Sequence, residues 1–275
     1  MRIAKLSLIA ALVSAGPASA QRAGTLISST PAPSAAAGMQ SWRINYWTTD
    51  DRGAPMAVTG LVIAPPGPAP RMPRNVIAWT HGTWGVSQQC APSLSPRFYQ
   101  QTPALDAVAN GDVIVAPDYP GLGSSGPHPY LVGPITARSV LDAVRAAQAI
   151  PGAGAGNKFA VWGESQGGHA ALWTGQIAAS YAPELRLVGV AAAAPPTDLA
   201  ANFDQASNAN AKAFLTGYTA YSWSQYYGVP LQIGGPNVPR MITKMAAGCL
   251  GGTPKPSLGS LQHFVTPDPK KCWMD

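Results

Sequence analysis

The pentapeptide GESQG at residues 163–167 constrains the fold of this chain more than any other feature of the sequence. The apolar run KFAVW just before it predicts a buried strand, and GHAALW just after it predicts a helix. A turn that joins these elements directly leaves little room for side chains, and glycines stand two positions before and two positions after Ser165. The sequence therefore predicts a strand, a strained turn that carries Ser165, and a helix in immediate succession.

A G-x-S-x-G turn between a strand and a helix is typical of the nucleophile elbow of α/β-hydrolases. Such a turn raises the Ser165 hydroxyl clear of the sheet and places the backbone N–H of Gln166 beside it, at the start of the helix. The alternative is an ordinary Gly/Ser turn without chemistry. The strand-to-helix context favours the elbow, and we expect Ser165 to act as a nucleophile.

The remaining hydrophobic pattern predicts an α/β protein. Apolar or alternating runs of strand length occur at residues 42–46, 56–64, 76–79, 113–116, 159–162 and 187–192. The first two runs flank the turn at residues 50–53 and predict an antiparallel hairpin. Most later runs are separated by stretches of helix length, such as residues 136–150. We therefore expect an α/β-hydrolase fold, with a mostly parallel sheet and helices on both faces.

The pattern changes at Asp198, after which helical stretches replace the strand-like runs. Aromatic residues recur at helical spacing between residues 214 and 221. These aromatic residues indicate either a helical cap over the site or side chains that pack a small hydrophobic core within this segment. The two interpretations are compatible. We accordingly divide the chain into a hydrolase core at residues 21–197 and a cap region at residues 198–275.

The first twenty residues predict a signal peptide. Arg2 and Lys5 form its charged start, residues 6–13 its apolar stretch, and residues 18–20, ASA, its cleavage site. The apolar stretch is too short to span a bilayer. We expect an exported, soluble protein, secreted to the extracellular space or the periplasm. An uncleaved membrane anchor is the alternative, which a mature N-terminus at Gln21 would exclude.

Charge and cysteine content limit the possible partners. The formal net charge is +6 and the longest basic run is the pair at residues 270–271, so we expect no nucleic-acid partner and at most a transient contact with an anionic lipid interface. An exported chain can form disulfides. The three cysteines, Cys90, Cys249 and Cys272, allow one bond and leave one thiol, and the sequence does not choose the pair.

Residues 81–83, HGT, follow the predicted strand that ends at Thr80. In α/β-hydrolases the loop at this place supplies one backbone N–H of the oxyanion hole, and the residue after the nucleophile, here Gln166, supplies the other. Such donors stabilise the charge of the tetrahedral intermediate. Thr83 is the best candidate for the first donor and Gly82 the next. The alternative is a tight loop with a capping threonine.

Two further motifs invite functional interpretations that the rest of the sequence does not support. Asp118 precedes the serine, whereas a hydrolase acid follows it, so we interpret Asp118 as a carboxylate that organises its loop. Residues 121–126 match G-x-G-x-x-G, but a dinucleotide site needs a helix there, and residues 127–129, PHP, forbid one. We expect no cofactor and no metal. His128 lies in this loop and is expected to border the site.

A serine nucleophile needs a histidine base and a carboxylate that orients it. After Ser165 the only histidines are His169 and His263. His169 lies on the elbow helix, and we interpret it as a hydrogen-bonded histidine beneath the turn rather than as the base. Asp198 with His263 would complete a triad in the right order. The other interpretation places the acid and histidine beyond Asp275 and the late strands of the sheet with them.

Several motifs together resemble the secretory lipase family of α/β-hydrolases, which includes the fungal A-type lipase. They are THGT at 80–83, CAPS at 90–93, APDY with GLG at 116–123, HPY at 128–130 and GESQGGH at 163–169. The resemblance covers about residues 40–200 well and the cap region loosely. It implies hydrolysis of acylglycerols or other carboxylic esters outside the cell, under a helical cap and without a cofactor.

The same resemblance implies roles for particular residues. It implies Ser165 as nucleophile and Gln166 as oxyanion donor, and it suggests that Cys90 bonds a cysteine of the cap, Cys249. The hypothesis is therefore a secreted serine lipase or carboxylesterase acting on a small-molecule or lipid ester. Two alternatives stay open: an acyltransferase or peptidase on the same elbow, and a non-catalytic lipid-binding protein with the hydrolase fold.

Overall fold

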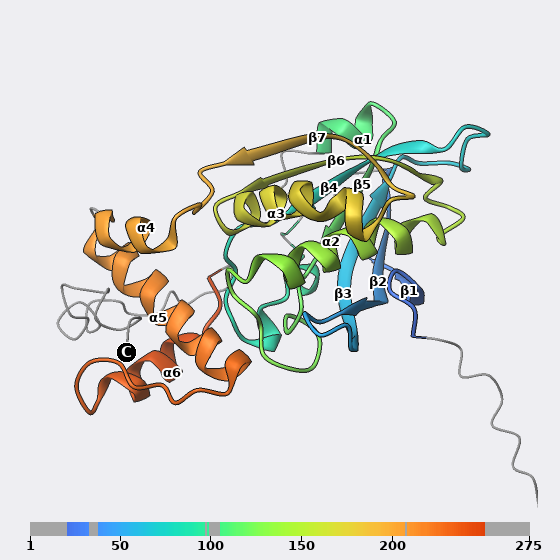
Figure 1. The fold of residues 1–275 in the computed structure, drawn as a ribbon. Helices are drawn as coiled ribbons and strands as arrows, with labels where there is room; N and C mark the ends of the chain where they lie inside the picture. The colour runs from blue at the N-terminus through green and yellow to red at the C-terminus, as the bar shows by residue number, and fades with distance from the viewer. Residues whose placement is uncertain (1–20, 33–37, 97, 99–104, 207, 251–275) are drawn as a thin grey trace, which may run out of the picture.

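The computed structural model describes residues 21–32, 38–96, 98, 105–206 and 208–250. The predicted signal peptide, His263 and Cys272 lie outside these residues. Seven strands form one sheet in the order β1-β2-β3-β5-β4-β6-β7 (Figure 1). The strands are β1 (Leu26–Pro31), β2 (Gln40–Thr49), β3 (Pro55–Ala64), β4 (Arg74–Thr80), β5 (Val113–Pro117), β6 (Ala155–Glu164) and β7 (Arg186–Ala193).

The sheet combines an antiparallel part with a parallel part. Strands β1, β2 and β3 pair antiparallel, and β3 continues antiparallel to β5. Strands β5, β4, β6 and β7 then run parallel to one another. The predicted hairpin and the predicted α/β fold class are confirmed. The sequence pattern does not predict strand β1, because its residues are mostly polar and exposed and no apolar period marks it.

Helices cover both faces of the sheet. The helices are α1 (Leu105–Ala109), α2 (Gly133–Gln148), α3 (Gln166–Tyr181), α4 (Leu199–Gln205), α5 (Ala209–Tyr227) and α6 (Val238–Ala246). Alternate residues of β5 face opposite sides: Val115 belongs to the hydrophobic core that includes residues of α2 and α3, and Ile114 to the core that includes Val108 of α1. This period-two alternation lets one apolar strand serve two cores.

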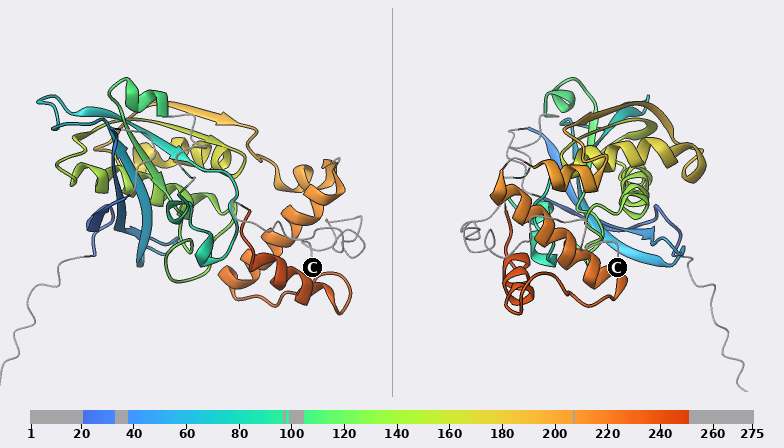
Figure 2. Two further views of the ribbon diagram at one scale, coloured as in Figure 1. Left: turned by 180° about the vertical axis from the view of Figure 1, so that it is seen from behind. Right: turned by 60° about the vertical axis from the view of Figure 1, so that its left-hand side comes forward.

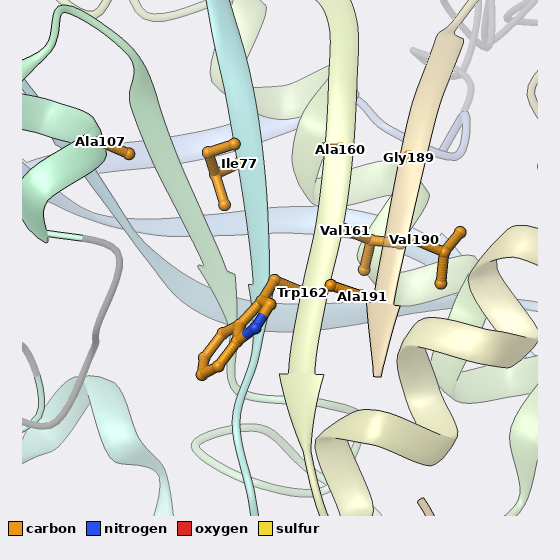
Figure 3. A pocket seen from close by; sticks show the side chains of 8 residues that line it. All are labelled: Ile77, Ala107, Ala160, Val161, Trp162, Gly189, Val190 and Ala191. Atoms are coloured by element: carbon orange, nitrogen blue, oxygen red, sulfur yellow. The ribbon is translucent and has the colours of Figure 1, made fainter. Parts of the chain in front are cut away.

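Strand β7 lies at the edge of the sheet and is more exposed than the sequence predicts. The apolar run at residues 187–192 predicts a buried strand, yet Val188 is 51% exposed and Val190 41% exposed. In the described part of the chain, β7 pairs only with β6. Beside it a hollow of about 480 Å³ opens on the sheet face, lined by residues such as Ile77, Trp162 and Val190 (Figure 3). An apolar run reveals a strand, but not its place in the sheet.

Helices α4, α5 and α6 gather beyond the carboxyl ends of β6 and β7 (Figures 1 and 2). They share a hydrophobic cluster that includes Phe214, Tyr218 and Ile242, and this cluster also contains Tyr130 and Leu131 from the loop before α2. The disulfide Cys90–Cys249 joins the segment after α6 to the short helix η1 (Gln88–Cys90) and confirms the suggested pairing. Every described helix is too short or too polar to cross a membrane.

Candidate active site

Ser165 lies at the junction of β6 and α3, with its side chain exposed. Its backbone φ is 56° and ψ −121°, a combination that residues other than glycine rarely adopt. The Ser165 N–H donates to the Ala193 carbonyl at 2.9 Å, and the Ser165 carbonyl accepts from the His169 N–H at 3.1 Å. The turn is therefore held between the end of β7 and the first turn of α3, as the predicted elbow requires.

The glycines on either side of Ser165 are needed because the turn presses against β4. A Cβ atom at Gly163 would lie 2.1 Å from Thr80 Oγ1, and one at Gly167 would lie 1.9 Å from the Thr80 carbonyl oxygen. Thr80 Oγ1 in turn donates a hydrogen bond to the Gly167 carbonyl oxygen at 2.8 Å. Both distances to a Cβ are far below van der Waals contact, so only glycine fits at either position.

The loop at residues 81–83 lies against the elbow. A Cβ at Gly82 would be 3.5 Å from the Glu164 carbonyl oxygen. Thr83 Oγ1 lies 2.8 Å from the hydroxyl of Tyr130. On the other side of Ser165, Gln166 is the first residue of α3, so its N–H belongs to the first-turn donors without an intrahelical partner. The structure thus brings the predicted oxyanion loop and the predicted helix N-terminus to the same junction.

Asp118 organises its loop, as the sequence predicts. Its carboxylate is fully buried and accepts hydrogen bonds from Thr59 Oγ1 at 2.6 Å and from the Ser93 N–H at 2.8 Å, as well as from the Ser93 hydroxyl. Burial raises the pKa of Asp118, while these hydrogen bonds lower it. The carboxylate therefore ties the end of β5 to β3 and to the segment that follows Cys90.

The G-x-G-x-x-G match at residues 121–126 forms turns, and the next helix, α2, begins only at Gly133. The helix that a dinucleotide site needs does not open there. Instead the loop folds back closely: Gly121 has φ +79°, and a Cβ on it would lie 2.3 Å from the backbone nitrogen of His128. The loop turns His128 toward the elbow, where its Nε2 lies 3.0 Å from Gln166 Nε2. No sequence motif predicts this contact, although the sequence places His128 in a loop that borders the site.

The side chain of His169 is hydrogen-bonded, as expected. Its Nε2 accepts from Trp173 Nε1 at 3.0 Å, and burial lowers its pKa to about 4. Asp198 caps α4 by accepting from the Ala201 N–H at 2.9 Å. Its predicted partner His263 lies outside the described residues, so that pairing stays a prediction.

The described part of the chain pairs no histidine side chain with a carboxylate. The ring of His81 lies 2.7 Å from the Gly82 carbonyl oxygen, and burial lowers the pKa of this histidine to about 4. The described residues also contain no group of three His, Cys, Asp or Glu side chains that could hold a metal ion. What these residues assemble is an exposed hydroxyl, a helix N-terminus and a tight loop beside it.

A hollow of about 490 Å³ lies next to the elbow helix, between α3 and α5. Its walls are mostly apolar and aromatic, with contributions from Leu172 and Trp173 of α3 and from Trp223 and Tyr227 of α5. His169, one helical turn after Ser165, lies at its border. An apolar space of this size beside the helix that follows Ser165 is suited to the hydrocarbon part of a ligand.

Comparisons with known proteins place these features in context. The model of the family described as "Secretory lipase" matches residues 99–222. The protein named "Probable inactive lipase" of Mycobacterium tuberculosis is 30% identical over 172 residues, which cover 58% of this chain and 37% of that protein. Lipase A of Moesziomyces aphidis is 27% identical over 168 residues, 57% of this chain and 35% of that protein. The matches thus span little more than a third of either relative.

Solved structures show the same fold. Candida antarctica lipase A in its closed state superposes with a TM-score of 0.66 at 21% identity, over 89% of this chain and 60% of that chain. The rice cell wall degrading esterase LipA from Xanthomonas oryzae gives a TM-score of 0.69 at 20% identity, over 90% of this chain and 74% of that chain. These comparisons confirm the α/β-hydrolase fold and the resemblance to secretory lipases.

Proposed function

We propose that this protein is a secreted serine hydrolase that cleaves carboxylic esters, with Ser165 as its nucleophile. The observation that carries the proposal is the exposed Ser165 hydroxyl on a positive-φ turn between β6 and α3. A strained backbone at an exposed serine is costly, and it serves to present the hydroxyl at a helix N-terminus. The similarity to lipases and esterases supports the reaction class.

In this mechanism Ser165 Oγ attacks the ester carbonyl carbon and forms a tetrahedral intermediate. The N–H groups of Gln166 and Thr83 donate hydrogen bonds to the oxyanion, and the positive end of the α3 dipole adds to this stabilisation. The intermediate expels the alcohol and leaves an acyl-enzyme on Ser165, which water then hydrolyses. A histidine must accept the Ser165 proton and pass it to the leaving alcohol. We propose that this base lies outside the described residues, where His263 also lies.

The substrate class follows from the surroundings of the elbow. The apolar hollow between α3 and α5 suits a hydrocarbon chain, and the relatives are named lipases. We therefore propose lipid esters such as acylglycerols as substrates, and residues 198–275 as the cap over the site. The predicted signal peptide, the disulfide and the secretory family favour a location outside the cytoplasm.

A second candidate is a lipid-binding protein without catalytic activity. One relative carries the name of an inactive lipase, and no described histidine pairs with a carboxylate. Such a protein would use the same hollow to hold a lipid but would not release an alcohol. Acyl transfer and peptide cleavage on the same elbow differ from ester hydrolysis in the acceptor or the bond cleaved, so analysis of products in the presence of alcohols and amines separates them.

The test compares turnover of short-chain and long-chain nitrophenyl esters by the full-length protein and its variants. We expect Ser165→Ala to lower kcat by roughly a thousandfold or more, because it removes the nucleophile. Ser180→Ala is the matched control, since Ser180 is an exposed serine on the same helix whose hydroxyl bonds only the Ile177 carbonyl among the described residues. Equal turnover by the wild type and Ser165→Ala contradicts the proposal. Lipid binding without turnover by the wild type favours the second candidate.

A further inference from the structure

The side chain of Gln166 is anchored by a single hydrogen bond among the described residues. It is 2% exposed, and its Nε2 lies 3.0 Å from His128 Nε2. Its Oε1 is buried and has no partner in the described part of the chain. A buried amide with one partner depends on that partner for its position. His128 therefore controls where the side chain of Gln166 lies.

The other contacts of His128 determine which ring nitrogen carries the proton. Its Nδ1 lies 2.8 Å from the Pro120 carbonyl oxygen, which can only accept, so Nδ1 carries the proton. Burial lowers the pKa of His128 to about 4, and nearby His81 adds to this effect. The ring is therefore neutral, and its Nε2 carries a lone pair. Gln166 Nε2 donates to that lone pair, so both ends of the contact are chemically matched.

The position of His128 is itself fixed from several sides. Its ring stacks on Tyr119 with the ring planes 9° apart and the centroids separated by 6.2 Å. The hydroxyl of Ser222 on α5 donates to the His128 carbonyl and accepts from the Tyr130 N–H at 2.8 Å. The histidine is thus locked between the loop after β5 and the first long helix beyond β7, and it has little freedom to follow a movement of Gln166.

We infer that His128 is a positioning residue for oxyanion stabilisation: by accepting from the Gln166 side chain, it fixes the Gln166 backbone N–H relative to Ser165. This inference rests on the proposed function, because it assigns His128 a role in the reaction of Ser165. His128 acts through Gln166 and touches no reacting atom. Because Ser222 of α5 holds the same loop, the contact also links the helices beyond β7 to the geometry of the elbow.

Two substitutions by amides separate the two hydrogen bonds of the ring. In His128→Asn the amide nitrogen replaces Nδ1, so the bond to Pro120 is kept and the acceptor for Gln166 is lost. In His128→Gln the amide oxygen replaces Nε2, so the acceptor for Gln166 is kept. We expect His128→Asn to lower kcat about tenfold at nearly unchanged KM and His128→Gln to stay within about threefold of the wild type, because a misplaced oxyanion donor weakens transition-state binding only.

Gln166→Met approaches the same contact from its other end, since it keeps the backbone N–H but removes the amide. We expect its kcat to fall like that of His128→Asn, and the double variant to be no slower than either, since both remove one interaction. ¹⁵N NMR of the labelled imidazole in the wild type should show the tautomer protonated at Nδ1. Tyr46→Phe, which removes a buried hydrogen bond to the Ser139 carbonyl far from the elbow, serves as the stability control and should keep the wild-type kcat.

Each outcome of these experiments supports or overturns the positioning role of His128. Equal kcat values for His128→Asn and the wild type, or equal losses in His128→Asn and His128→Gln, would overturn the inference while Ser165-dependent turnover upholds the proposed function. An effect on KM alone, additive losses in the double variant, or an imidazole protonated at Nε2 would also overturn it. Absence of any Ser165-dependent turnover in the wild type would overturn the proposed function and the inference together.

Discussion

Ser165 takes a backbone conformation that side chains disfavour, and its neighbours show how the chain accommodates it. Gly163 and Gly167 let the turn approach Thr80 more closely than any side chain would allow. The hydrogen bond from the Ser165 N–H to the Ala193 carbonyl holds the turn on its other side. Strain at one residue is therefore maintained by close packing of the backbone around it.

Gly167→Ala tests this packing directly. Its Cβ would lie 1.9 Å from a backbone oxygen of Thr80, so β4 and α3 must separate. We expect the free energy of unfolding to fall by about 1–3 kcal/mol, as overpacked cores do, and ester turnover to fall with it. Urea unfolding followed by circular dichroism measures the change.

Gly189→Ala is the control for that substitution. Gly189 lies on β7, and a Cβ there would meet nothing within 4 Å. We expect a change within about 0.5 kcal/mol, in line with surface positions that no close contact constrains. Equal destabilisation by the two substitutions would show that the elbow has room for a side chain and that its glycines are incidental.

Among the elements, the cross-link between η1 and the end of α6 has the clearest consequence. The disulfide Cys90–Cys249 joins residues 159 positions apart. Two hydrogen bonds reinforce it, from Ser87 Oγ to the Ala246 carbonyl at 2.6 Å and from Gln89 Nε2 to the Ala247 carbonyl at 2.7 Å. A disulfide removes more conformational entropy from the unfolded chain the longer the loop that it closes. Because the loop between Cys90 and Cys249 is long, this bond restricts the unfolded chain strongly.

Reduction of this disulfide should therefore destabilise the protein. We expect the free energy of unfolding to fall by about 2–5 kcal/mol, the usual cost of losing a native disulfide in a small secreted domain. Thermal unfolding with and without dithiothreitol, with thiols counted by mass spectrometry, measures the effect. The double variant Cys90→Ala with Cys249→Ala should show the lower midpoint and no response to the reductant. A fully reduced wild type that keeps its midpoint would contradict this expectation.

The sequence predicted those elements whose pattern is local. The apolar runs of β2 to β6, the helical spacing of α2 and the elbow between β6 and α3 all follow from periodicity and from glycine placement. Strand β1 was missed because its pairing with β2, rather than its composition, makes it a strand. The exposure of β7 was missed because burial depends on what lies beside a strand in the sheet.

The same limit applies within the site. Ser165 and the loop at residues 81–83 could be located because a motif marks each of them. The contact between His128 and Gln166 joins residues 38 positions apart, and no motif records it. The hydrogen-bond partners of Asp118 could be expected only in kind, since Thr59 and Ser93 reach it from other elements.

At the scale of the whole molecule, the parallel strands converge on one edge where chemistry can be assembled. The carboxyl ends of β4 and β6 meet the start of α3, and α4 to α6 gather beyond that edge (Figure 2). Ligands of open α/β sheets bind at the carboxyl ends of the strands. Ser165 therefore lies at the edge of the sheet beyond which these helices gather, and the hollow between α3 and α5 lies beside the helix that follows it.

Covalent labelling of the full-length protein with a fluorophosphonate, followed by peptide mass spectrometry, tests the central claim most directly. Such reagents phosphonylate a serine only where its hydroxyl is activated and an oxyanion can be stabilised. The account predicts a single adduct on Ser165, absent from Ser165→Ala and retained in Ser180→Ala. An unlabelled wild type, or an adduct on another residue that persists in Ser165→Ala, would contradict it.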